Sequence, residues 1–354
     1  MRMVSWAAGI GLLLLLAPAC GDGGSEQASG AGGGSSSSGA GGQGGDGAGG
    51  GGGNGGGGAS KGWQGLAPLA NGPRQETAVV AFEGKILVIG GFTAGGDVVP
   101  DIEAYDPATD SWSSFAPLPK SVHHANAAVA LGKIYVLGAL QELSFTEIGD
   151  VYEYDPSTGA WSAKTSMPPG TERGASAVGV IGSKIYVAGG LRKGTVADFS
   201  AYDAASDTWE SLPSLPEPRD HLAGGAADGV FYAIGGRNGG IGAIAETVYA
   251  FDPKTGMWAT RAPMPTPRGG TAGALVKGRF IVVGGEGNAE AASGVFDDVE
   301  AYDPAADAWS ALAPMLTPRH GTGAAELNGK LYVPGGATQQ AFGAVDTNEV
   351  LVLE

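Results

Sequence analysis

The chain has 354 residues and a formal net charge of −16, and 66 of its residues are glycine. An acidic chain lacks the basic surface that neutralises phosphates, so we expect no nucleic-acid partner. A single cysteine excludes an intramolecular disulfide and leaves a cysteine-based zinc site without its ligands. The glycines are unevenly spread, because residues 21–62 hold 23 of the 66.

The N-terminus has the pattern of a signal peptide. Arg2 precedes a mostly apolar run from Ala7 to Ala17, and Ala19 ends the segment. This run is too short to span a bilayer, which takes about 20 residues, but it fits the 7 to 15 residues of a signal-peptide core. We therefore predict that residues 1–19 are a signal peptide.

Cys20 follows this segment directly and precedes a Gly-Asp-Gly-Gly run. The arrangement resembles a bacterial lipoprotein signal, in which the cysteine becomes the lipidated first residue. It departs from that pattern in having Ala17 three places before the cysteine, where the family has leucine, with Leu16 one place further back. The resemblance implies lipidation of Cys20 and anchoring in the bacterial cell envelope, at the outer membrane or the cell surface. The alternative is ordinary secretory cleavage after Ala19, which leaves a free thiol.

Residues 20–62 would then be a lipidated cysteine followed by a tether. The segment consists of Gly, Ser and Ala with scattered charges, and such a composition cannot bury enough apolar surface to offset its chain entropy. A flexible tether of about 40 residues has a root-mean-square reach of roughly 35 Å. We expect the lipid anchor to be the only contact of the chain with a membrane.

The rest of the chain, residues 63–354, repeats one pattern of three landmarks. The first is a tryptophan, at Trp63, Trp112, Trp161, Trp209, Trp258 and Trp309. The second is a diglycine that begins at Gly90, Gly189, Gly235, Gly284 and Gly335, with Gly138-Ala139 as a degenerate copy. The third is an aromatic residue followed by Asp, seven residues before a tryptophan, at Tyr105, Tyr154, Tyr202, Phe251 and Tyr302. A fixed phase across the copies indicates a repeat protein.

Each copy reads as four short strands. Residues 76–82 and 85–89, for example, are two runs of small or β-branched residues split by Glu83-Gly84, which is a hairpin signal. Two further strands flank the Asp-Pro turn, and four strands at this period predict a propeller blade. The three landmarks together resemble the kelch repeat. This resemblance implies a propeller of six or seven blades, and here there are six copies.

The two ends of the repeat region complement each other. The sixth copy stops at residue 354 before any tryptophan strand, whereas Trp63-Gln64-Gly65-Leu66 supplies such a strand at the other end. We therefore predict an all-β fold, a six-bladed kelch-type β-propeller over residues 63–354, whose last blade is closed by the N-terminal strand around Trp63. Closure leaves no unpaired sheet edge.

The landmarks themselves are interpreted as structural. An aromatic side chain at one phase of every blade is expected to pack against the neighbouring blade, and the diglycine is expected to leave room for it. The Asp of the Tyr-Asp-Pro motif is expected to form the turn.

A periodic arginine is the candidate ligand-binding feature. It stands 16 residues before the first glycine of the diglycine, at Arg74, Arg173, Arg219, Arg268 and Arg319, and Val122 replaces it in the second copy. These residues lie where the chain enters the innermost strand, so they are expected to ring the mouth of the central channel. The same face carries the variable loops between the second and third strands, at 92–101, 140–150, 191–198, 237–246, 286–298 and 337–348. Such a ring would suit a carboxylate, a sulfate or an acidic peptide. The alternative is that each arginine binds backbone carbonyls of the neighbouring blade or pairs with a local acid such as Glu172 or Asp220.

Three histidines lie beside the predicted ring, at His124, His221 and His320. They could serve in acid-base chemistry or as metal ligands. They belong to three different blades and nothing in the sequence enforces their convergence, so we expect solvated or hydrogen-bonded side chains. We expect no metal and no cofactor.

The resemblance also bears on activity. The copper oxidase branch of kelch proteins needs a cysteine cross-linked to a tyrosine, and the single cysteine here is assigned to the anchor. No Ser-His-Asp order, phosphate loop or carboxylate pair stands out. We therefore predict a monomeric, non-catalytic binding module for a protein or an acidic glycan or peptide. The alternative is a carbohydrate-active kelch enzyme of the sialic acid mutarotase or epimerase type.

Overall fold

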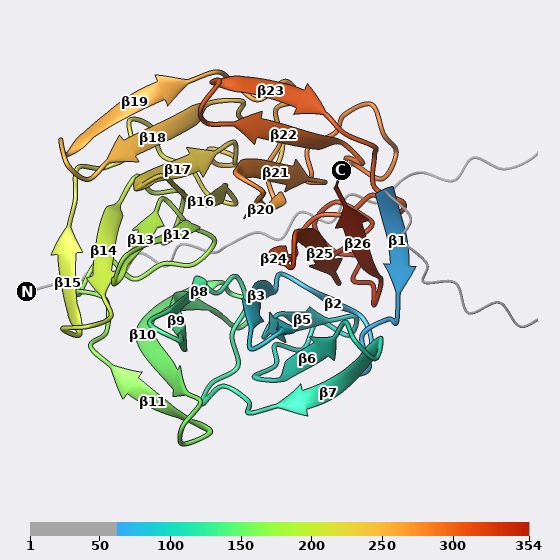
Figure 1. The fold of residues 1–354 in the computed structure, drawn as a ribbon, viewed down its shortest axis with the longest axis horizontal. Helices are drawn as coiled ribbons and strands as arrows, with labels where there is room; N and C mark the ends of the chain where they lie inside the picture. Colours follow the sequence, from blue (N-terminus) through green and yellow to red (C-terminus); the bar gives the residue numbers. More distant parts are fainter. Residues whose placement is uncertain (1–61, 354) are drawn as a thin grey trace, which may run out of the picture. The chain divides into compact units, whose positions relative to one another are not determined.

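The computed structural model describes residues 62–353, and all the regular elements in this range are β-strands. Six four-stranded antiparallel sheets lie side by side in a closed ring around a central axis (Figure 1). The prediction of a six-bladed β-propeller is therefore confirmed. The predicted signal peptide, Cys20 and the tether up to residue 61 lie outside the described residues. Within residues 62–353, no helix is long and apolar enough to cross a membrane.

The first three blades follow the chain from the inside of the ring outward. Blade 1 contains β3 (Ala78–Phe82), β4 (Lys85–Ile89), β6 (Ile102–Asp106) and β7 (Ser111–Phe115). Blade 2 contains β8 (Ala127–Ala130), β9 (Lys133–Gln141), β10 (Thr146–Asp155) and β11 (Ala160–Lys164). Blade 3 contains β12 (Ala177–Ile181), β13 (Lys184–Ala188), β14 (Phe199–Asp203) and β15 (Thr208–Ser211).

The other three blades continue the ring. Blade 4 contains β16 (Ala223–Ala227), β17 (Val230–Ile234), β18 (Val248–Asp252) and β19 (Met257–Arg261). Blade 5 contains β20 (Ala272–Val276), β21 (Arg279–Val283), β22 (Val299–Asp303) and β23 (Ala308–Ala311). Blade 6 contains β24 (Ala325–Leu327), β25 (Lys330–Pro334), β26 (Asn348–Val352) and β1 (Gly62–Leu66). A small separate sheet pairs β2 (Arg74–Gln75) with β5 (Phe92–Thr93).

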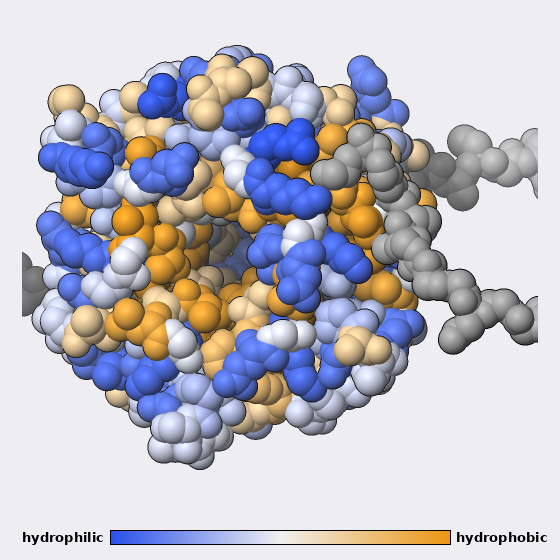
Figure 2. Space-filling model, viewed as in Figure 1, coloured by the Kyte–Doolittle hydropathy of each residue, from blue (hydrophilic) through white to orange (hydrophobic). Residues whose placement is uncertain are grey.

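The innermost strands are rich in alanine, glycine and valine because they meet around a narrow axis. A Cβ atom at Gly179 would lie 2.7 Å from the backbone of Gly225 in the next blade, which is too close. The second strands are apolar over most of their length, as in β4, because each blade buries both faces against its neighbours. The central channel that remains has a volume of about 350 Å³ and is lined by residues of all six blades. Figure 2 shows a hollow at the centre of the ring.

The N-terminal strand closes the sixth blade, as predicted. Strand β1 pairs antiparallel with β26, with Trp63 opposite Leu351. The last blade therefore combines the beginning and the end of the described chain.

Tryptophan side chains join neighbouring blades around the outside of the ring. Each indole Nε1–H donates a hydrogen bond to a carbonyl oxygen just after the outer strand of the preceding blade. The donor and acceptor pairs are Trp63 to Ala313, Trp112 to Ala67, Trp161 to Ala116, Trp209 to Thr165, Trp258 to Pro213 and Trp309 to Ala262, at 2.7–3.0 Å. The structural interpretation of the tryptophans is confirmed.

The diglycines make room for backbone rather than for aromatic rings, so that expectation was wrong. A Cβ atom at Gly284 would overlap the carbonyl oxygen of Arg319 in the next blade. The NH group of the following residue, Gly285, donates a hydrogen bond of 3.0 Å to that same oxygen. The close approach of two blades at this point requires the absence of side chains.

Blade 2 departs from the predicted loop at 140–150. Strands β9 and β10 continue as one long hairpin, and only residues 142–145 connect them. The second glycine of the diglycine has a φ between 87° and 119° in the other five blades, whereas blade 2 has Ala139 there. An alanine disfavours that backbone conformation, so the strand runs on.

We predict that deleting residues 63–70 lowers the melting temperature by several degrees. The deletion removes the outer strand of blade 6 and the hydrogen bond from Trp63 to Ala313, and it exposes the edge of β26. Thermal denaturation followed by circular dichroism checks this. A melt identical to that of the intact chain would contradict the closure.

Candidate functional site

The five periodic arginines do not ring the channel mouth, and the prediction of a ligand-binding ring was wrong. All five are buried inside their own blades: Arg74, Arg173, Arg219, Arg268 and Arg319. Arg268 contacts Glu300 at 2.5 Å and Arg319 contacts Glu349 at 2.7 Å, and Arg74 pairs with Glu103 at 3.3 Å.

The remaining two arginines are held by other groups of their own blades. Arg173 donates to the carbonyl oxygens of Gly189 and Val187 and to the Ser200 hydroxyl. Arg219 pairs with Glu217 and Thr247. The alternative of carbonyl and acid partners therefore holds in kind, but the carbonyls belong to the arginine's own blade rather than to the neighbouring blade, and the acids are not Glu172 or Asp220.

The arginines are buried because each one connects the segment that enters its blade to the third strand of that blade. The acid partner in blades 1, 5 and 6 lies on that strand, two residues before the position of the Tyr-Asp motif. A buried guanidinium needs a paired charge or several acceptors, and the blade supplies them. This leaves none of the five guanidiniums for a ligand at the mouth.

We predict that Arg268→Ala costs about 3–5 kcal/mol of stability, because it leaves the buried Glu300 carboxylate unpaired. The double variant Arg268→Met/Glu300→Gln should lose less, since no charge is then stranded. Chemical denaturation of the three proteins measures the difference. A single variant within about 0.5 kcal/mol of the wild type would show that the ion pair is not needed.

Six residues form an inner ring around the channel, two positions after the arginine phase. They are Glu76, His124, Ala175, His221, Gly270 and Gly321, one from each blade, and all have φ between 51° and 65°. Each NH group donates a hydrogen bond to the carbonyl oxygen of the equivalent residue in the preceding blade, and Glu76 closes the circle onto Gly321. The inner ring therefore fixes three polar side chains, those of Glu76, His124 and His221, at one end of the channel.

Two neighbouring positions bring further polar side chains to the same place. The residue that precedes the inner-ring residue is Asp220 in blade 4 and His320 in blade 6. In both blades it forms an isolated β-bridge with the residue that follows the diglycine. The residue that follows the diglycine is Arg237 in blade 4 and Glu286 in blade 5. We call the combined group the mouth cluster, consisting of Glu76, His124, Asp220, His221, Arg237, Glu286 and His320.

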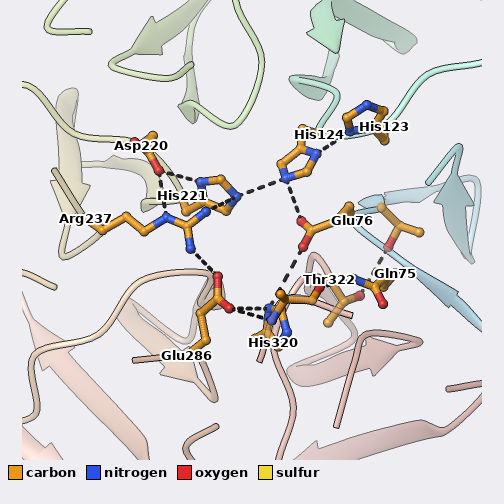
Figure 3. A network of polar contacts seen from close by, with 12 residues as sticks. Gln75, Glu76, His123, His124, Asp220, His221, Arg237, Glu286, His320 and Thr322 are labelled. Atoms are coloured by element: carbon orange, nitrogen blue, oxygen red, sulfur yellow. Dashed lines mark hydrogen bonds and ion pairs between the residues drawn. The ribbon is translucent and has the colours of Figure 1, made fainter. Parts of the chain in front are cut away.

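The mouth cluster is a continuous polar network (Figure 3). His124 Nε2 lies 2.9 Å from His221 Nε2 and 3.0 Å from Glu76 Oε2. Arg237 lies between the two carboxylates, with Nε 3.0 Å from Asp220 and Nη1 bonded to Glu286, while Nη2 lies 3.0 Å from His221 Nε2. His320 Nδ1 faces Glu286 at 3.6 Å and Glu76 at 3.9 Å. The structure thus brings together the three predicted histidines, whose convergence was not expected.

Burial and neighbouring charge shape the protonation of the cluster. Burial raises the pKa of Glu76, but the contact with His124 and the nearby imidazoles of His221 and His320 lower it by more, so the pKa lies well below its usual range. Burial and the Arg237 charge lower the pKa of His221. His123, adjacent to the cluster, has its pKa lowered to about 4 by burial and by the charge of His124. Glu76 is therefore a carboxylate near neutral pH, and His221 is neutral.

An apolar rim borders the cluster on the side of the long loops. A cavity of about 100 Å³ is lined by Glu76, His124, His221, Arg237 and Glu286 together with Phe92, Phe145, Ile241 and Phe342. Phe92 is within ring-contact distance of the other two phenylalanines, since its ring centroid lies 6.1 Å from that of Phe145 and 5.9 Å from that of Phe342. Phe342 is 57% exposed. The mouth therefore has a polar floor and an apolar aromatic rim, Phe92, Phe145 and Phe342.

Sequence reasoning found the histidines but missed Glu76, Asp220, Arg237 and Glu286 as site residues. A signal was present in the repeat phase. The inner-ring position lies 14 residues before the first glycine of the diglycine, and Arg237 and Glu286 directly follow a diglycine. Aligning the six copies at these positions would have gathered the cluster.

The comparisons with known proteins agree with this architecture. A family model described as the KLHDC2/KLHL20/DRC7 Kelch-repeats domain matches residues 164–336, and the Kelch motif matches residues 73–119. The chain carries kelch repeats. Kelch-like protein terF of Aspergillus terreus is 37% identical over 280 residues, which cover 75% of this chain and 61% of that protein. Human Kelch-like protein 7 is 46% identical over 165 residues, 47% of this chain and 28% of that protein.

The chain spans 61% of the first relative and under a third of the second, so both relatives are longer than the region that matches. Among solved structures, that of YjhT superimposes on this kelch propeller with a TM-score of 0.68 at 16% identity, covering 82% of this chain and 97% of the other. At that identity the likeness concerns the fold alone.

Proposed function

We propose that this kelch propeller is a non-catalytic interaction module that binds a protein partner at the channel mouth. The observation that carries the proposal is the aromatic rim, in which the exposed Phe145 and Phe342 pack on the buried Phe92 beside a polar floor on the face of the long loops. The kelch propeller fold supports a protein-interaction module in general, and the aromatic rim is the surface to which we assign that role.

The composition of the mouth favours a protein over an acidic glycan. Aromatic side chains around a buried polar centre are typical of the residues that dominate protein interfaces. Three carboxylates and one guanidinium leave the mouth cluster at a net charge of −2 when its histidines are neutral. Without a bound cation this charge repels acidic ligands, so an acidic glycan or peptide is a less suitable partner.

The alternative of an acidic-sugar enzyme loses its main support. It depended on arginines at the mouth, and the five periodic arginines are committed to partners within their blades. Arg237 does reach the mouth, but Asp220 and Glu286 already bind it. We therefore place a protein partner first.

We expect Phe145→Ser/Phe342→Ser to abolish capture of the partner. The test immobilises the purified chain, exposes it to envelope extract and identifies retained proteins by mass spectrometry. The matched control is Leu131→Ser, because Leu131 is as exposed as Phe342, at 57%, but lies in the turn at the opposite end of β8. Partner retention should survive in the control.

Two results would contradict the proposal. One is equal retention by the aromatic-rim double variant and the wild type. The other is turnover of an acidic sugar, followed as anomer exchange by nuclear magnetic resonance, which would favour the enzyme instead.

We also propose that the module is a monomer held in the bacterial cell envelope by lipidated Cys20. The support is the sequence pattern of residues 1–24, with an apolar core of suitable length before a cysteine. The glycine-rich segment that follows suits a tether that lets the binding face reach a partner. Several acyl chains would make this anchor stable, whereas one chain is marginal.

We predict that Cys20→Ser abolishes incorporation of labelled fatty acid and moves the protein from the membrane fraction to the soluble fraction. Metabolic labelling followed by fractionation measures both. Undiminished labelling of the variant would remove the anchor from the proposal without touching the interaction site.

A further inference from the structure

The hydrogen bonds of the mouth cluster dictate which histidine nitrogens carry hydrogen. His123 Nε2 lies 2.9 Å from the carbonyl oxygen of Glu142, which can only accept, so that nitrogen is the donor. Neutral His123 then presents a lone pair at Nδ1, and His124 Nδ1, which contacts it, must donate. This leaves His124 Nε2 facing the interior of the cluster.

The same reasoning applies to the other two histidines. His221 Nδ1 lies 2.6 Å from Asp220 Oδ1 and donates to it, so Nε2 is the bare nitrogen. His320 Nε2 lies 2.8 Å from the carbonyl oxygen of Gln339, so the buried Nδ1 is bare and has no hydrogen-bond partner. His124, His221 and His320 therefore each turn one ring nitrogen toward the interior of the cluster. The other nitrogen of each ring donates a hydrogen bond, to His123, Asp220 and the carbonyl oxygen of Gln339, respectively.

These nitrogens meet a carboxylate at one point. His124 Nε2, His221 Nε2 and a Glu76 carboxylate oxygen all lie within 4.8 Å of one another, and all three residues are buried. Lone pairs so close repel unless a cation lies between them. The net charge of −2 in the mouth cluster has the same consequence. A proton on His124 or a metal ion could supply the positive charge.

We propose that Glu76, His124 and His221 form a binding site for a divalent transition-metal ion such as Zn²⁺. Two imidazoles and one carboxylate are an established donor set for this class of metal, with metal–ligand distances of about 2.0–2.2 Å. Tetrahedral ligands at such distances lie about 3.3 Å apart. The nitrogen–nitrogen distance of 2.9 Å and the nitrogen–oxygen distance of 3.0 Å, both at His124, need to open slightly, and the remaining pair, His221 and Glu76, which lies within 4.8 Å, needs to close.

The surroundings of the site fit this assignment. Asp220 accepts the hydrogen bond from His221 Nδ1, which is the usual carboxylate partner behind a metal-binding histidine. The three ligands line both the channel and the cavity at the aromatic rim, so a fourth ligand can reach the metal from either side. The inner ring holds all three residues by backbone hydrogen bonds, which fixes their spacing.

Arg237 is the one neighbour that opposes a metal. Its Nη2 lies 3.0 Å from His221 Nε2 and donates to the lone pair that the metal would use. The other guanidinium nitrogens are held by Asp220 and Glu286, so metal binding requires the loss of this one contact. Removing the guanidinium should therefore strengthen binding, which a purely structural role of the cluster would not produce.

The test titrates Zn²⁺ into the full chain, without an affinity tag and stripped with a chelator, by isothermal calorimetry. We expect one ion per chain with a Kd of about 1 µM or lower, and a melting temperature raised by about 5 °C at 100-fold excess over Kd. Glu76→Gln and His124→Asn should each weaken Zn²⁺ binding more than about 100-fold. This is a larger loss than the one expected when a residue that only hydrogen-bonds to a metal ligand is replaced. Arg237→Gln should tighten it. Asparagine suits His124 because it tolerates a positive φ.

The matched control is Glu83→Gln. Glu83 also has a positive φ, of 47° compared with 55° for Glu76, but it is exposed in the turn between β3 and β4. The affinity of the Glu83→Gln variant for Zn²⁺ should equal that of the wild type. Co²⁺ bound to the wild type should give the visible absorption bands of a tetrahedral site, and this measurement does not depend on the folding of any variant.

The proposal is overturned by either of two results. One is wild-type Zn²⁺ binding weaker than about 100 µM, with no tetrahedral Co²⁺ spectrum, which would leave a proton on His124 as the cation. The other is full affinity in folded Glu76→Gln and His124→Asn variants, which would place the ion elsewhere. Neither result affects the interaction proposed for the aromatic rim.

Discussion

The structure depends on one closed circle of backbone hydrogen bonds around the channel. Each inner-ring residue adopts a left-handed conformation, donates its NH group to the preceding blade and accepts from the following one. A propeller has no sheet that crosses the axis, so contacts between blades must hold the ring together. The inner ring does this near the axis, and the tryptophan indoles do it at the outside.

The same circle produces the candidate site. A left-handed backbone is most easily adopted by glycine, and blades 5 and 6 have Gly270 and Gly321 in the inner ring. Glu76, His124 and His221 adopt it at some cost in backbone energy, in blades 1, 2 and 4. Unusual backbone conformations occupied by chemically active side chains are typical of functional sites. These side chains are buried beside Arg237, and their burial concentrates charge at the mouth.

The arginines illustrate how a regular position can mislead. A cation repeated in five of the six blades suggests a ring for an anionic ligand, but repetition also follows from a structural need that those blades share. In each of them a buried guanidinium joins the entry segment to the rest of the blade, through carbonyls in blade 3 and with a carboxylate in blades 5 and 6. The candidate functional positions are instead those where the blades differ, such as the residue after the diglycine, which is Phe92, Arg237 or Glu286 in different blades.

The sequence by itself determined the propeller, the number of blades and the closure of the last one, because these follow from landmarks in a fixed phase and from the complementary ends of the repeat. It also placed the long loops on one face, apart from blade 2, where Ala139 lets the hairpin continue. Only the tertiary structure decided which side chains meet at the axis. Residues such as Glu76 and Glu286 are separated by four blades along the chain, and the repeat gives equivalent positions in the blades but not which of their side chains contact one another. Ring closure and the direction of each side chain bring His124, His221 and His320 together.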